Sequence, residues 1–275
     1  MIIYIFMGII ILITIIIVLF VHFNKTNKEK YNDIKTDNKI VCLYAYYEKD
    51  NQYKNNLEFF LNKGGILEEI DYYIIVNGQC TVNIPEYKNI KIIYRENKGY
   101  DFGAYFHVLE NHINKKYDYY VFLNTSVCGP YYLEKNNKKW IDYFLELFNK
   151  TDVKIVGTSI NMSSLGTHVQ SMFFVITNDY LDILKKEDFI NEKKINNYTN
   201  IWDIVVNYEI KLSKIALDKG YNINCILSKY KDKDYRVLKN NINPSNDDPY
   251  FPNKYFNGTI DKYEVIFFKN TRIPE

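Results

Sequence analysis

The sequence has little of several features that mark common protein classes. Its few cysteines form no CxxC pair, so neither a zinc site nor a redox motif is indicated. The formal net charge is only +2, and the basic residues are scattered among acidic ones without an Arg-rich face, which argues against nucleic acid as a partner. No internal repeat is evident, and no GxGxxG, Walker loop, HExxH or GxSxG motif occurs. Any chemistry must therefore come from residues outside these motifs.

The chain does have enough apolar sequence for one core. It contains 275 residues, of which 47% are hydrophobic and 25% are charged. That length suits one good-sized globular domain, whereas two full domains would be cramped. The cysteines are widely spaced and fit small buried positions in such a core, at Cys42, Cys80, Cys128 and Cys225.

The N-terminal segment predicts a membrane anchor. Residues 2–21 carry no charged side chain and are long enough to cross a bilayer as a helix, with a buried core helix as the alternative. A secretory signal would have a shorter apolar region, a basic start and a small-residue cleavage site. We therefore expect an anchor over residues 1–23, a polar stalk over 24–38 and one domain over 39–275. Lysines follow the anchor and none precedes it, which favours a cytoplasmic domain by the positive-inside rule.

Two polar turns stand out within the domain. The apolar run 90–94 ends in a turn with Gly99, and Asp101 lies where apolar residues begin to recur at helical spacing. A second apolar run, 119–123, stops at the polar residues 124–126. This order of strand, turn, helix, strand and turn is half of an α/β nucleotide-binding layout. Because ligands bind at the carboxyl ends of the strands in such sheets, both turns should face one crevice.

The rest of the chain predicts walls around that crevice. Apolar runs predict strands at 39–47, which would be central, and at 71–76, 154–157, 170–177, 221–227 and 263–272. Helical spacing predicts helices around 57–61, 140–148, 178–184 and 200–217. Between them, residues 161–168 are expected to form a polar loop, and residues 228–258 a surface loop or flap.

Several polar residues have both a functional and a structural interpretation. Asp101 can cap its helix, or it can hold a base or ribose hydroxyl, and nearby glycines would let a ligand approach the backbone. His168 can coordinate a metal or act as an acid or base, or it can join Gln170 and Ser171 in anchoring a loop. Glu209 lies on an otherwise apolar helical stretch. If Glu209 faces the crevice, a raised pKa would suit a general base that deprotonates an acceptor hydroxyl.

Five blocks of the chain together resemble a known family. Within roughly residues 40–272 they resemble, in order, the blocks of glycosyltransferases related to the rhamnan-synthesis F type. The resemblance implies a single Rossmann-like domain of the glycosyltransferase A type with a mixed, mostly parallel sheet. It also implies a nucleotide-sugar donor and a glycan acceptor. The blocks are Asn97 to Tyr105, Phe122 to Pro130, His168 to Met172, Tyr208-Glu209 with Gly220 to Ile223, and Tyr263 to Arg272.

The resemblance also suggests roles for single residues. Asn124 and Ser126 stand where a metal-dependent glycosyltransferase carries Asp-x-Asp, and amide and hydroxyl groups are poor substitutes as metal ligands. Use of Mg²⁺ or Mn²⁺ is therefore an open alternative, and Lys269 and Arg272 would supply positive charge beside the donor diphosphate. The proposed donor-binding residues are Tyr44, Ala45, Asp101, Asn124, Ser126, Lys269 and Arg272. The proposed catalytic residues are Glu209 and His168, and the acceptor-binding residues are Gln170 and Ser171.

The leading hypothesis is a membrane-anchored glycosyltransferase that moves a sugar from a nucleoside diphosphate onto a glycan or polysaccharide hydroxyl. Many anchored glycosyltransferases face away from the cytoplasm, so the side of the membrane stays open. The alternative is a catalytically inactive sugar- or nucleotide-binding membrane protein of the same fold, favoured by the missing Asp-x-Asp. A sugar nucleotidyltransferase is a weaker rival, because no Gly- and basic-rich phosphate loop follows Tyr47.

Overall fold

The computed structural model describes residues 38–132, 138–150, 152–238 and 240–272. Lys39–Glu275 forms one compact unit. The predicted anchor and all but the last residue of the predicted stalk lie outside the described residues, so both stay predictions. None of the helices in the described part of the chain is both long and apolar enough to span a bilayer.

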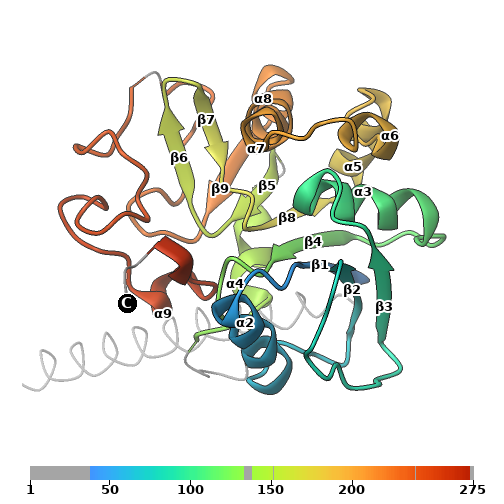
Figure 1. Cartoon of the computed structure of the whole chain (residues 1–275). Coiled ribbons are helices and arrows are strands. Elements are labelled where there is room, and N and C mark those ends of the chain that lie inside the picture. Colours follow the sequence, from blue (N-terminus) through green and yellow to red (C-terminus); the bar gives the residue numbers. More distant parts are fainter. Residues whose placement is uncertain (1–37, 133–137, 151, 239, 273–275) are drawn as a thin grey trace, which may run out of the picture. The chain divides into compact units, whose positions relative to one another are not determined.

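A mixed sheet forms the centre of this unit. Within the described residues its seven strands lie in the order β3-β2-β1-β4-β8-β5-β9 (Figure 1). The strands β3, β2, β1 and β4 are parallel neighbours, β8 runs antiparallel to β4 and β5, and β5 is parallel to β9. The expected mixed, mostly parallel α/β sheet is thus confirmed. The strands are β1 Ile40–Tyr46, β2 Ile70–Asn77, β3 Ile90–Arg95, β4 Tyr119–Asn124, β5 Val153–Gly157, β8 Phe173–Thr177 and β9 Asn222–Cys225.

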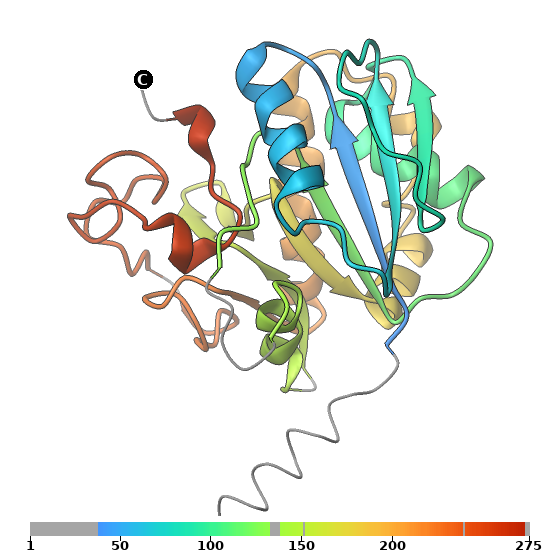
Figure 2. The ribbon, with the colours of Figure 1, turned by 90° about the horizontal axis from the view of Figure 1, so that it is seen from below.

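Helices cover both faces of the sheet. Figures 1 and 2 place α2 and α4 on one face, and α3 with α5 to α8 on the other. Every residue of β1 is buried, because this strand has neighbours on both edges and helices on both faces. The helices are α2 Asn51–Asn62, α3 Tyr100–Asn111, α4 Asp142–Leu145, α5 Asn178–Lys186, α6 Glu192–Ile195, α7 Ile201–Ile204, α8 Lys211–Asp218 and α9 Lys262–Val265, with short 3₁₀ turns η1 Glu146–Phe148 and η3 Asn270–Arg272 and a π segment η2 Val205–Ile210.

Aromatic side chains hold these layers together. Successive residues of a strand point to opposite faces, so β8 supplies Phe174 to one face and Phe173 to the other. Phe174 stacks on Phe102 of α3, with ring centroids 6.1 Å apart. On the opposite face Phe173 stacks on Phe267, with centroids 4.6 Å apart. The first contact fixes the start of α3, next to Asp101, and the second fixes the C-terminal segment.

Two predicted segments have a different structure. The expected polar loop at 161–168 is a two-stranded hairpin, β6 Ile160–Ser163 and β7 Gly166–Val169. The expected strand at 263–272 is instead α9, one isolated bridge between Phe268 and Cys128, and η3. The backbone at Ile266 has φ 65°, which breaks an extended chain. The apolar run in this segment packs its rings into the core and does not join the sheet.

Candidate active site

Asp101 lies in the first turn of α3. The N-cap residue of this helix is Gly99, whose φ of 68° is left-handed and which makes no side-chain cap. Asp101 Oδ1 accepts a hydrogen bond from the backbone N–H of Phe102 at 3.0 Å. A carboxylate in the first turn is favoured by the helix dipole. Asp101 therefore lies two residues past the N-cap, and its second carboxylate oxygen, Oδ2, is directed at Asn124 of β4.

The two polar turns predicted from the sequence do meet. Asn124 Nδ2, at the end of β4, donates to Asp101 Oδ2 at 2.7 Å. Asn124 Oδ1 accepts from Ser126 N at 3.0 Å and from Ser126 Oγ at 2.6 Å. The amide of Asn124 is held between an acceptor on one side and two donors on the other. A continuous chain of hydrogen bonds thus joins the start of α3 to the end of β4.

The carboxyl of Asp101 has a raised pKa. Burial disfavours its charged form and is the largest cause. The hydrogen bond from Asn124 opposes this effect, while the negative charge of Glu209 adds to it. Asp101 and Glu209 therefore interact electrostatically, although one is on α3 and the other on the π segment.

Glu209 lies in a second polar cluster with His168 and Ser171. Glu209 Oε1 is 3.3 Å from His168 Nε2, and Glu209 Oε2 accepts from Ser171 N at 3.1 Å and from the Ser171 hydroxyl. The other ring nitrogen of His168, Nδ1, is 3.0 Å from the carbonyl oxygen of Gly166. His168 is 3% exposed. Because acceptors face both ring nitrogens, the cluster stabilises a doubly protonated imidazolium.

The pKa values of this pair shift in opposite directions. Burial alone would raise the pKa of Glu209, but the hydrogen bond and charge of His168, the Ser171 hydroxyl and the charge of Lys269 together lower it to about 2. Burial alone would lower the pKa of His168, but Glu209 raises it. The expectation of a raised pKa at Glu209 is therefore wrong. Its neighbours are cations and donors, which favour the ionised form more than burial disfavours it.

The π segment explains how Glu209 reaches this cluster. The sequence predicts one regular helix over 200–217, whereas η2 inserts a wider turn between α7 and α8. Tyr208 and Ile210 are buried on either side of Glu209. Such π turns displace the helix register locally and often occur at functional sites. The wider turn lets three consecutive side chains face inward.

The C-terminal segment brings positive charge to the same place. Asn56 of α2 and Asn270 exchange two hydrogen bonds, of 3.0 and 2.8 Å. Thr271 Oγ1 donates to the carbonyl oxygen of Ser126 at 3.4 Å. Lys269 lies close enough to Glu209 to lower its pKa. The backbone of Arg272 belongs to η3, which follows directly.

A comparison with known families fits this arrangement. The sequence model of the rhamnan synthesis protein F family matches residues 76–250, which is more than half of the chain. The chain belongs to this family. The matched span includes Asp101, Asn124, His168 and Glu209, and it stops before Lys269.

The chain is also distantly similar to solved structures. One is a mannosyltransferase from Pyrobaculum calidifontis in complex with GDP-Man and Mn²⁺, with 5% identity, a TM-score of 0.37, and coverage of 55% of this chain and 47% of that chain. The chain thus spans about half the length of that mannosyltransferase. Another is the galactosyltransferase LgtC in complex with donor and acceptor sugar analogs, with 12% identity, a TM-score of 0.33, and coverage of 57% and 69%. No curated protein matches the sequence.

Three of the predicted site residues have buried side chains. Tyr44 is 1% exposed and packs on Phe60 with ring centroids 4.8 Å apart. Ala45 is 3% exposed, and its carbonyl oxygen accepts from the backbone N–H of Thr125. Gln170 is buried between Ser159 and Asp248, with hydrogen bonds of 2.6 and 2.8 Å. The first two have no exposed side-chain surface for a nucleotide, because β1 is buried on both faces.

The site also depends on residues that sequence reasoning missed. Asn56 donates to the carbonyl oxygen of Thr125 at 2.9 Å as well as to Asn270. The two asparagines are 214 residues apart in the chain. In a chain so rich in asparagine, no local pattern distinguishes this pair, so only the tertiary contact reveals it.

The side chains at this site do not offer a metal ion three protein ligands. Among residues 38–132, 138–150, 152–238 and 240–272, no group of three or more His, Cys, Asp or Glu side chains could hold a metal. Asn124 Oδ1 already accepts two hydrogen bonds from Ser126. Amide and hydroxyl oxygens are also weaker ligands than carboxylates. The described residues therefore do not fit a metal held by the protein alone.

Proposed function

We propose that the protein transfers a sugar from a nucleoside-diphosphate sugar to a hydroxyl of a glycan acceptor. Membership in the rhamnan synthesis protein F family supports this, and the observation that carries it is the hydrogen-bonded chain from Asp101 through Asn124 to Ser126. These hydrogen-bonded residues lie at the carboxyl end of β4, where open α/β sheets bind their ligands.

The donor would be held by the hydrogen-bonded residues Asp101, Asn124 and Ser126. Asp101 and Asn124 are half-buried and polar, so they can exchange hydrogen bonds with sugar or ribose hydroxyls. Lys269 and Arg272 lie on either side of Thr271 in the chain, and Thr271 donates a hydrogen bond to the carbonyl oxygen of Ser126. Their positive charge would stabilise the leaving diphosphate, as electrostatic stabilisation of developing charge requires.

The two carboxylates of the site suit different tasks. A carboxylate with a pKa of about 2 is a poor proton acceptor at neutral pH, so Glu209 would serve as a fixed anion that holds His168 and orients Ser171 toward the acceptor. Asp101 has a raised pKa and is the better proton acceptor of the two. As a proton acceptor Asp101 can take a hydrogen bond from a donor hydroxyl, and acceptor positioning is assigned to Glu209, His168 and Ser171.

Transfer and donor-hydrolysis assays with a panel of nucleotide sugars test the proposal. We expect release of a nucleoside diphosphate from at least one donor, and a loss of at least about a hundredfold in Asp101→Asn and Asn124→Ala. Asn149→Ala changes an exposed asparagine and should keep full activity. Absence of turnover with every donor, in protein that is folded by circular dichroism, would count against the proposal.

One observation favours a binding protein without activity as the second candidate. Asn124 and Ser126 hydrogen-bond each other, and they carry no charge of their own for a diphosphate. Nucleotide binding without turnover, unchanged in Asn124→Ala, would favour this candidate. The same assays therefore separate the two functions.

A further inference from the structure

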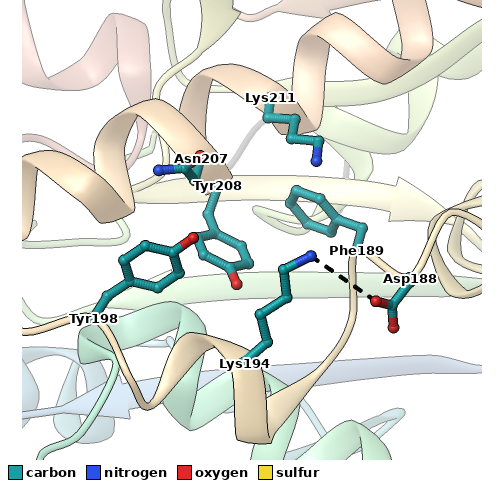
Figure 3. A pocket seen from close by; sticks show the side chains of 7 residues that line it. All are labelled: Asp188, Phe189, Lys194, Tyr198, Asn207, Tyr208 and Lys211. Atoms are coloured by element: carbon teal, nitrogen blue, oxygen red, sulfur yellow. Dashed lines mark ion pairs between the residues drawn. The ribbon is translucent and has the colours of Figure 1, made fainter.

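A separate polar cavity lies between α6 and the π segment. Its volume is 220 Å³. Figure 3 shows the Lys194 and Lys211 side chains extending toward this cavity from opposite walls, with the Tyr208 hydroxyl to one side of them. The volume is below the range of about 300–1,000 Å³ that is usual for drug-sized ligands, so the cavity suits one small group. Its lining residues are Asp188, Phe189, Lys194, Tyr198, Asn207, Tyr208 and Lys211.

Tyr208 lines this cavity with a hydroxyl that makes no hydrogen bond to the described residues. The residue is only 3% exposed, and its ring packs on Phe189 and Tyr198. Within the part of the chain that the structure describes, neither the Tyr208 nor the Tyr198 hydroxyl makes a hydrogen bond. The Tyr208 oxygen is not among the buried polar atoms without a partner in the described residues, so water or a ligand can reach it. The cavity is therefore the place where Tyr208 can find an acceptor.

The charged side chains of the cavity are also incompletely paired. Lys194 Nζ is 3.9 Å from Asp188 Oδ2, which is at the limit for an ion pair, and both side chains are more than half exposed. Asp188 Oδ1 also accepts a hydrogen bond from Asn191 Nδ2 at 3.0 Å. Lys211 has no ion-pair partner among the described residues. Two ammonium groups and one carboxylate leave the cavity with a net positive charge.

We propose that this cavity binds a phosphoryl anion, free or carried by a small sugar. The groups available to a ligand are two ammonium groups and two phenolic hydroxyls, and all of them can donate hydrogen bonds. Charge-assisted hydrogen bonds from such donors are the stronger kind. A phosphoryl group presents several acceptor oxygens on a centre small enough for the cavity. Asp188 Oδ2 is 3.9 Å from the Lys194 ammonium, at the limit for an ion pair, so this ammonium can also contact the anion.

The cavity shares a wall with the candidate active site but is distinct from it. Tyr208 packs on Phe102 with ring centroids 5.9 Å apart. Glu209 follows Tyr208 in the sequence, and Asp101 precedes Phe102. Tyr208 therefore lines the cavity, whereas its neighbour Glu209 belongs to the candidate active site. The proposed anion site does not depend on the transferase function and can be tested without an activity assay.

Isothermal titration of the full chain with inorganic phosphate, glucose 6-phosphate and glucose tests the proposal. We expect saturable binding of the first two and none of glucose, since the anionic group provides the contacts. Lys211→Gln and Tyr208→Phe should each weaken binding about tenfold, because each removes one donor to a charged group. Lys214→Gln is the matched control on the same helix, where the lysine pairs with Asp218 and not with the cavity. Tighter binding of glucose 6-phosphate than of phosphate would identify a sugar phosphate as the better ligand.

Three outcomes would overturn the proposal. The first is no saturable phosphate binding to folded protein. The second is equal binding by Lys211→Gln, Tyr208→Phe and Lys214→Gln. The third is loss of phosphate binding in Asn124→Ala but not in Lys211→Gln, which would place the phosphate at the donor site instead. Thermal unfolding of each variant shows whether a loss of binding reflects a loss of folding.

Discussion

Asn124 uses one amide group to hold two polar turns together. Its nitrogen donates to Asp101 and its oxygen accepts from Ser126, so the orientation of the amide is fixed by both neighbours. An aspartate at this position would meet Asp101 with a second carboxylate. The amide therefore has a structural reason to be there, independent of any ligand.

This arrangement predicts that Asn124→Asp destabilises the protein in a pH-dependent way. Two carboxylates with oxygens about as close as the present 2.7 Å contact cannot both ionise, so one folded-state pKa must rise. A rise of one to two pKa units corresponds to about 1–3 kcal/mol of lost stability at pH 7. The loss should shrink as pH falls toward the unfolded pKa of Asp, about 3.9. Urea unfolding at pH 7 and pH 5 measures this, with Asn149→Asp as the exposed control.

The His168–Glu209 pair predicts a window of maximum stability. The folded pKa of Glu209 is lowered from 4.5 to about 2, so its contribution is present above pH 4.5 and is lost as pH falls toward 2. The folded pKa of His168 is raised above 6.5, so its contribution is present below pH 6.5 and is lost as pH rises through the raised value. The pair therefore contributes most between pH 4.5 and 6.5.

Glu209→Gln tests this window. Without the carboxylate, burial should lower the pKa of His168, and NMR titration of its ring protons should show a midpoint below that of the wild type. Glu187→Gln breaks an exposed ion pair with Lys219 and should change stability by no more than about 1 kcal/mol. A His168 midpoint that is unchanged in Glu209→Gln would contradict the proposed pairing.

At the scale of elements, α3 depends on close approach by the chain that follows α5. A Cβ at Gly103 would lie 2.2 Å from the carbonyl oxygen of Lys98 and 3.2 Å from Asn196 Oδ1. Asn196 also accepts a hydrogen bond from Arg95, so it cannot move away without loss. The start of α3, which carries Asp101, is thus held by a contact that only glycine permits.

Gly103→Ala is therefore expected to destabilise the protein despite the better helix propensity of alanine. Propensity favours alanine by about 1 kcal/mol, whereas overpacking typically costs about 1–3 kcal/mol, so the net effect is a loss. Gly258→Ala is the matched control, because its Cβ would be 3.4 Å from the nearest atom, an ordinary contact. Thermal unfolding compares the two. A Gly103→Ala variant as stable as the wild type would show that the α3 contact is loose.

The elements of the chain differ in how well sequence patterns predict them. The parallel strands and α3 follow from apolar runs, and all were predicted within a few residues. The hairpin β6–β7 was missed because its outward polar residues resemble a loop. The prediction of a strand at 263–272 was wrong, because the apolar side chains of this segment, such as Phe267, pack against β8 while its backbone does not join the sheet. Apolar character predicts burial, but it does not say whether a buried segment pairs its backbone with a sheet.

At the scale of the whole molecule, we also propose that residues 1–23 attach the protein to a membrane. The full chain should sediment with membranes, resist extraction by high salt and be released by detergent, because a long apolar segment partitions into the bilayer. A chain lacking residues 2–37 should stay in the supernatant, since Lys39–Glu275 forms its own compact unit. Full-length protein that appears in the supernatant without detergent would contradict the anchor.

The sequence by itself determined the α/β class, the central strand and the pairing of Asp101 with Asn124 at one edge of the sheet. These features depend on periodicity and on the rule that parallel strands end together. Only the tertiary structure decided the lowered pKa of Glu209, the burial of Tyr44 and the contact between Asn56 and Asn270. A pKa, an exposed fraction and a long-range hydrogen bond each depend on every group that surrounds a side chain, and those groups come from distant parts of the chain.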